Sequence, residues 1–393
     1  MTETPDTTGA RLRLARQARG FSQQHLAGMA GVSRQAVSAV ESGHSDPSLR
    51  VALALAQALG MTVEELFGPG DLAQPVLAVP LAPLMGQERV ALAPVGDQFV
   101  ALPLRGDAAA SRSFIPAGGL AVRAGAGWPV AALVEAGRPV AAPAVKGSAA
   151  KDTITVQPIG PPRPTLVVAG CDPALPLLAT PLGLLDPPVA FAWWPCGSGA
   201  ALRLAAAGLV HAAGVHLRDA EGGYNAAAAR ELPGGAEVVG FTAWREGLVI
   251  RRELDGVITG LDGVVKHRLR MVNREPGAEA RRLLDRERER LGLDPAELPG
   301  YDTQAGGHLQ VASAVTAGLA DAGVASEPAA RAYDLGFVPL ADERFDLVLP
   351  GAHIGSREVQ GLLKVLTSPW LLAQLASLPG YDAAACGERA TRA

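Results

Sequence analysis

The chain has 393 residues, of which 48% are hydrophobic and 19% are charged, so it can bury several cores and lacks the composition of a disordered protein. Its formal net charge of −4 excludes a uniformly basic nucleic-acid coat but allows one small DNA-binding module. The length fits two or three domains.

The three cysteines, Cys171, Cys196 and Cys386, are far apart, and no two of them form a C-x-x-C pair. This spacing argues against a disulfide framework and a cysteine-based zinc site, and it fits a reducing compartment. The N-terminus lacks the apolar core of a signal peptide, and no segment is apolar enough to span a membrane. We therefore expect a cytoplasmic protein without a membrane partner, a metal or a cofactor.

Residues 9–68 predict an all-α bundle of five short helices, because apolar residues recur at spacings of three and four. Within it, residues 22–43 encode two helices joined by a tight turn at Gly31. Exposed side chains on the second helix should reach bases or phosphates in a major groove, and one on the first helix should contact the DNA backbone. The predicted DNA-binding residues are Gln23, Ser33, Arg34, Gln35 and Ser38.

This stretch resembles the lambda-repressor/Cro-like helix-turn-helix family, from SQQHLAGMAGVSRQAVSAVESG to the closing LALAQALGMTVEELF. The resemblance implies sequence-specific binding to double-stranded operator DNA, usually as a homodimer. One module reads only one half-site, so geometry also favours a dimer. The charges agree, since between residues 10 and 45 the arginines, Arg16 among them, face a single acid, Glu41. The alternative is a helical bundle used for protein contact.

Residues 69–163 predict a small β-rich connector module that ends in a stiff linker. Proline and glycine are dense there, and short runs such as Gln87–Leu92, Asp97–Leu104 and Pro129–Val134 are typical of strands. No motif in this part indicates a chemical function.

Residues 164–385 alternate strand-like and helix-like segments, which predicts an α/β fold with largely parallel sheets. Helix N-termini that point into one cleft can bind an anion through their free N–H groups. Four turns have the small or polar residues that this requires, at residues 170–173, 197–199, 273–277 and 306–308.

Residues 164–350 resemble the type II periplasmic-binding-protein-like domain that is found fused to DNA-binding modules, in the branch similar to molybdate- and tungstate-binding proteins. GCDPALPLLATPLG, VNREPGAEARRLLD and GYDTQAGGHLQVASAVTAG carry the resemblance. It implies two lobes, about 164–245 plus 342–385 and 246–341, joined by crossing strands near Phe241–Ile250 and Phe337–Leu349. A small oxyanion such as molybdate or tungstate would bind between them. The predicted ligand-binding residues are Cys171, Asp172, Gly197, Ser198, Tyr224, Asn225, Asn273, Arg274, Arg281 and His308.

The sequence departs from the family pattern at Ala278, Glu279 and Ala280, where two hydroxyl donors are lost and an acid is gained. An unpaired acid in an anion cleft is unfavourable. An organic or molybdenum-cofactor-like ligand is therefore an alternative, and so is a DNA-bound scaffold with a degenerate sensor. The sequence has no H-E-x-x-H motif, Walker loop or strained nucleophile elbow, which favours a ligand-responsive regulator over an enzyme.

Overall fold

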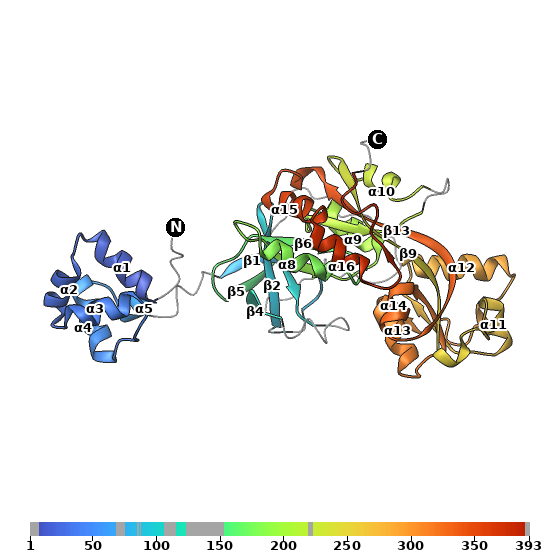
Figure 1. Cartoon of the computed structure of the whole chain (residues 1–393), viewed down its shortest axis with the longest axis horizontal. Coiled ribbons are helices and arrows are strands. Elements are labelled where there is room, and N and C mark those ends of the chain that lie inside the picture. Colours follow the sequence, from blue (N-terminus) through green and yellow to red (C-terminus); the bar gives the residue numbers. More distant parts are fainter. Residues whose placement is uncertain are drawn as a thin grey trace. The chain divides into compact units, whose positions relative to one another are not determined.

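The computed structural model describes residues 8–67, 75–84, 86, 88–105, 115–122, 153–218 and 223–389. Along the chain these ranges form a helical bundle, a small β-barrel and a two-lobed α/β domain (Figure 1). The expected fold class is thereby confirmed. Among these residues no helix combines the length and the apolar character needed to cross a membrane.

The bundle owes its short helices to serine and glycine residues at their ends. The side-chain oxygens of Ser22, Ser33 and Ser48 each accept a backbone N–H three residues further on, which caps the helix that follows. Gly31 and Gly60 end two helices in the left-handed conformation that glycine tolerates. The helices are α1 (Thr8–Ala18), α2 (Gln23–Ala30), α3 (Arg34–Glu41), α4 (Leu49–Leu59) and α5 (Val63–Phe67).

The middle module is a closed barrel of β1 (Val76–Pro80), β3 (Gln98–Pro103), β2 (Glu88–Val95), β4 (Gly119–Val122) and β5 (Ile154–Pro158), in that order. Val100 and Leu102 of the barrel belong to one hydrophobic core with Val167 and Ala213 of the α/β domain. The barrel is therefore packed onto its neighbour, which the sequence did not lead us to expect of a connector. The expected strand Pro129–Val134 lies outside the described residues.

The first lobe of the α/β domain is built on three parallel strands, β6 (Thr165–Ala169), β7 (Ala190–Trp194) and β8 (Ala212–Val215). Helical segments cover these strands, and β14 (Tyr381–Asp382) pairs with a strand that crosses between the lobes. The helical segments are η1 (Leu175–Leu178), α8 (Ala179–Gly183), α9 (Ser198–Ala206), α10 (Ala226–Arg230), η4 (Gly351–His353), α15 (Arg357–Leu366) and α16 (Pro369–Ala376).

The second lobe contains β10 (Met271–Arg274), which pairs in parallel with both β11 (Gln304–Ala305) and β12 (Ala322–Ser326). Two apolar clusters, on residues of the strands and of the helices around them, form its core. The helical segments are η2 (Arg252–Leu254), α11 (Leu261–Lys266), α12 (Glu279–Arg290), η3 (Pro295–Glu297), α13 (His308–Thr316) and α14 (Glu327–Ala332).

Two long strands, β9 (Ala236–Ile250) and β13 (Gly336–Pro350), run through both lobes and pair with each other over their whole length (Figure 1). They lie where the crossing strands were expected. Pairing inside each lobe is parallel, whereas both crossing strands pair antiparallel. The register shifts beside Pro339, and Gly247 lies opposite it. A Cβ on Gly247 would come 2.1 Å from the carbonyl oxygen of Val338, so only glycine fits this close approach.

We predict that Gly247→Ala destabilises the α/β domain by about 1–3 kcal/mol, because the added methyl group must push the crossing strands apart. Thermal melting followed by tryptophan fluorescence measures this, since the helical bundle contains no tryptophan. Gly355→Ala is the control, because Gly355 is exposed with no atom within 4 Å of the added Cβ. Equal melting temperatures for the two variants would contradict the prediction.

Candidate functional site

The first candidate surface lies at the beginning of α3 in the helical bundle. Arg34, Gln35 and Ser38 are exposed there, while Val37 on the other side of the helix is fully buried. Ser33 is exposed too, but its Oγ accepts the N–H of Ala36 at 3.0 Å and so caps the helix. The exposed face therefore presents a guanidinium, an amide and a hydroxyl, which are groups that can bind base edges or phosphates.

Gln23 at the start of α2 is tied into the bundle. Its Nε2 donates to Oε2 of Glu41 at 2.8 Å, and Arg16 binds the same carboxylate through Nε at 2.6 Å. Glu41 is buried, and its hydrogen bond raises the pKa of Arg16. The sequence analysis counted Arg16 among the charges that attract DNA. In the structure its guanidinium is paired with Glu41 of the same bundle. No spacing rule indicated this pair, which lies 25 residues apart.

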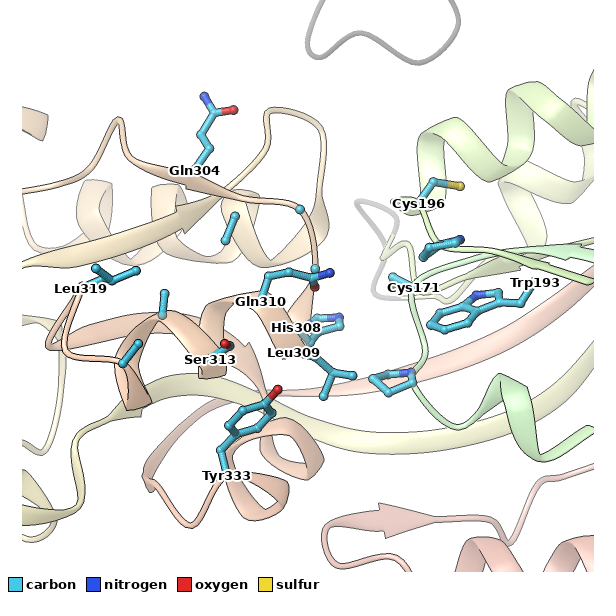
Figure 2. A pocket seen from close by; sticks show the side chains of 17 residues that line it. Cys171, Trp193, Cys196, Gln304, His308, Leu309, Gln310, Ser313, Leu319 and Tyr333 are labelled. Carbon is cyan, nitrogen blue, oxygen red and sulfur yellow. The ribbon is translucent and has the colours of Figure 1, made fainter. Parts of the chain in front are cut away.

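The second candidate site is a cleft of about 550 Å³ between the two lobes (Figure 2). In the figure, Cys171, Trp193 and Cys196 of the first lobe face His308 and other residues of the second lobe. Two of the four predicted turns contribute to its walls, through Cys171, Pro173 and residues 306–308, and Cys196 lies directly before a third. The lining residues used below are Cys171, Cys196, His308, Gln310 and Ser313.

The fourth predicted turn lies against the start of α9. A Cβ placed on Gly197, the N-cap residue, would come 3.4 Å from Oε1 of Glu275. Glu275 also binds Arg274 through two contacts, Nε–Oε2 at 2.8 Å and Nη2–Oε1 at 2.9 Å. A carboxylate of the protein itself therefore lies beside this helix N-terminus, and the buried Arg274 is paired with it.

Asp172 and Asn225 are fully engaged within the first lobe. The carboxylate of Asp172 accepts hydrogen bonds from Thr242 Oγ1 and Tyr381 Oη, both at 2.6 Å. Burial raises the pKa of Asp172, although these hydrogen bonds oppose the shift. Asn225 binds the N–H of Leu217 through Oδ1 and hence holds its own loop.

The remaining predicted residues also have partners within the protein. Ser198 Oγ accepts the N–H of His216 at 3.1 Å. Asn273 Nδ2 donates to the carbonyl oxygen of Tyr301, and the Tyr224 hydroxyl donates to that of Asp342. The Arg281 guanidinium lies 4.1 Å from the ring centroid of Tyr301. None of these four side chains is among the residues that line the cleft, so their role as ligand contacts stays a prediction.

A buried polar cluster lies next to Cys171 and His308 of the cleft wall, and the sequence analysis did not predict it. His216 follows β8, Glu246 is on β9, Glu343 is on β13, and His308 begins α13. His216 Nδ1 lies 3.5 Å from Glu343 Oε2 and 3.9 Å from Glu246 Oε2. These residues are far apart in the sequence, and no spacing pattern links them. The available signal was acidic residues inside the apolar segments WREGLVI and ADERFDLVLP.

The protonation of this cluster is set by burial and by its own charges. Burial raises the pKa of Glu246 to about 7. Burial lowers the pKa of His216, but Cys171 and the two carboxylates outweigh it, so the net pKa is well above the ordinary value. The pKa of His308 is well below its ordinary value because of burial and the nearby charge of Arg274. His308 Nδ1 accepts the N–H of Ser326 at 3.2 Å, so its neutral ring carries hydrogen on Nε2.

Comparisons with known proteins identify both ends of the chain. Residues 12–66 match the helix-turn-helix family, and residues 182–367 match the PBP superfamily domain. The uncharacterized protein YvgK of Bacillus subtilis is 32% identical over 177 residues, which are 44% of this chain. This chain spans 57% of that relative's length. The uncharacterized HTH-type transcriptional regulator MJ0272 of Methanocaldococcus jannaschii is 39% identical over 57 residues, 14% of this chain and 86% of the relative.

Solved structures also align with each end. The restriction-modification controller protein C.AhdI from Aeromonas hydrophila shares 45% identity over 15% of this chain and 91% of its own, with a TM-score of 0.15. The tungstate ABC transporter from Geobacter sulfurreducens shares 16% identity over 54% of this chain and 97% of its own, with a TM-score of 0.41.

We predict that Glu41→Gln destabilises the helical bundle by about 2 kcal/mol, because it leaves Arg16 without its carboxylate in a site where both side chains are largely buried. Loss of helix on heating, followed by far-UV circular dichroism, measures this. Asp46→Asn removes the same charge from an exposed position and serves as the control. If both variants melt like the wild type, the Arg16–Glu41 pair contributes nothing to the bundle.

Proposed function

Because the chain belongs to the helix-turn-helix family of transcriptional regulators and joins that module to a PBP superfamily domain, we propose that it is a ligand-responsive transcriptional regulator. The bundle binds operator DNA, and a small effector binds in the cleft. The observation that carries the proposal is this cleft, which lies between two lobes that the long paired strands β9 and β13 join. The effector binds without being chemically changed.

For DNA recognition we assign α3 to the major groove. Arg34 and Gln35 are exposed near its N-terminus, and neither makes a side-chain hydrogen bond to another residue of the described bundle. Arginine suits guanine, and glutamine suits adenine. We expect a homodimer on a two-part operator, since one α3 reads one half-site. Sedimentation of the protein–operator complex gives this stoichiometry directly.

We predict that Gln35→Ala weakens operator binding by about 1–3 kcal/mol, which is the usual contribution of one good base contact, and relaxes specificity at one base pair. Duplexes selected from a random pool, then used in gel shifts at fixed salt, provide the measurement. Gln57→Ala removes an exposed glutamine from α4 and should leave binding unchanged. Equal affinities of the two variants would remove Gln35 from the recognition surface.

The effector can act only if it binds one DNA-competence state of the protein more tightly than the other. Because the cleft has walls from both lobes, a ligand that contacts both walls favours one lobe arrangement. The sign of the coupling between effector binding and operator binding decides whether this arrangement favours binding to the operator or release from it. Gel shifts with and without effector measure this sign.

For the effector itself we propose a small anion such as molybdate or tungstate. His308 offers an N–H donor in the cleft wall, and α13 begins at the same residue. Glu246 and Glu343 lie close by and repel a bare anion, so an anion there needs a positive counter-charge. An organic or molybdenum-cofactor-like ligand, and a scaffold with a degenerate sensor, are the competing outcomes of the test below.

We predict that molybdate or tungstate raises the melting temperature of the full chain, whereas sulfate does so less. A ligand at one hundred times its Kd stabilises by about 2.7 kcal/mol. Ser313→Trp fills the cleft and should abolish the shift, while Ser377→Trp, at an exposed position directly after α16, should not. A response to organic metabolites alone would assign the organic ligand. No response to any compound, with operator binding intact, would indicate the degenerate sensor.

A further inference from the structure

We propose that His216, Glu246 and Glu343 bind a divalent transition-metal ion next to the cleft residues Cys171 and His308. The site deepens the proposed function, and it rests on that function only for the role of the ion in effector binding. The binding of the ion itself depends on these three side chains.

The spacing of the three donor atoms fits a metal ion. One nitrogen of His216 and one oxygen of each glutamate all lie within 4.8 Å of one another, and all three residues are buried. The two nitrogen–oxygen distances are 3.5 Å and 3.9 Å. An ion with bonds of about 2.1 Å keeps tetrahedral ligands about 3.4 Å apart. Only small side-chain movements are therefore needed to coordinate it.

The donor atoms also lack other partners. His216 Nδ1, both carboxylate oxygens of Glu246 and Oε2 of Glu343 have no hydrogen-bond partner among the described residues. Buried polar atoms nearly always have one. The raised pKa of His216 shows that a positive charge is favoured between these nitrogen and oxygen atoms, and a metal ion that binds there takes the place of the ring proton. The buried Arg274 attracts Glu246, but its guanidinium is bonded to Glu275.

The donor set indicates the class of ion. One imidazole nitrogen with two carboxylates suits Zn²⁺ and its neighbours in the first transition row, whereas Ca²⁺ and Mg²⁺ prefer all-oxygen sites. Cys171, His216 and His308 form a second group of possible ligands. In that group His308 Nδ1 accepts the Ser326 N–H, so Nε2 carries hydrogen and has no lone pair for a metal. We therefore choose the first group.

The position of this site connects it to the cleft. Cys171 and His308 line the cleft, and each offers an atom within 4.8 Å of a ring nitrogen of His216. The Nε2–H of His308 has no partner among the described residues and can donate to an anion bound beside the metal. The ion thus supplies the positive counter-charge that an anionic effector needs next to Glu246 and Glu343.

The proposed metal site also connects three strands of the sheet, β8, β9 and β13. His216 extends from the first lobe, whereas Glu246 and Glu343 belong to the two strands that cross between the lobes. An ion held by all three fixes the end of β8 against β9 and β13 close to the register shift.

The experiment uses the full chain, stripped of metal with a chelator and titrated with Co²⁺ and then Zn²⁺. We expect one equivalent of Co²⁺ to give the visible d–d bands of a four- or five-coordinate site, and Zn²⁺ to displace it. Glu246→Gln and Glu343→Gln should each weaken Zn²⁺ binding at least about 10- to 100-fold. Glu327→Gln is the matched control. Glu327 is a buried glutamate of the same domain, and its carboxylate forms ion pairs with Arg245 and Arg331. It should bind Zn²⁺ like the wild type.

Three results would overturn the proposal. The first is that neither ion binds saturably. The second is that binding survives both glutamate substitutions. The third is that binding is lost in Cys171→Ala but retained in Glu343→Gln. The wild-type Co²⁺ spectrum needs no variant, so a folding defect cannot obscure the first result. Operator gel shifts on the same samples separate this proposal from the regulatory one, since DNA binding and the anion response can each persist or fail independently of Zn²⁺ affinity.

Discussion

The α/β domain depends on the pairing of β9 with β13. These two strands form the centre of the sheet, and the sheet extends into one lobe from β9 through β12 and into the other from β13 through β8. Because both strands pass through both lobes, every residue near their midpoints is shared by the two halves. Glu246 and Glu343 lie there, which places acidic groups where apolar packing would otherwise be expected. The close approach at Gly247 and the register shift beside Pro339 lie next to these two glutamates.

The same constraint explains the chemistry of the cleft. Glu246 and Glu343 are buried on the crossing strands, so their carboxylates are desolvated and need a counter-charge. Glu327 obtains one from Arg245 and Arg331, and Glu275 obtains one from Arg274. Glu246 and Glu343 instead face His216. The carboxylates that arginines hold are structural, whereas the two that face His216 are the ones that we assign to a metal ion.

The sequence was sufficient for the order of modules and for the helices of the bundle, because caps and apolar periodicity are local signals. The sequence also located the turn at Cys171, which follows a strand, and the turn at His308, which begins a helix. It could not identify the partners of buried polar groups. The contacts Arg16–Glu41, Tyr381–Asp172 and His216–Glu343 join residues that only the folded chain brings together. Several predicted ligand residues, such as Asp172, are engaged in such contacts.

The shared core of the barrel and the first lobe sets where this chain can be divided. Leu81, Val95 and Leu102 would be exposed to water if the α/β domain were cut free at the proline-rich segment before Thr165. The separable sensor therefore begins with β1. An evolutionary or engineered exchange of DNA-binding modules should therefore divide the chain between α5 and β1. The barrel then stays with the sensor, and their shared hydrophobic core remains intact.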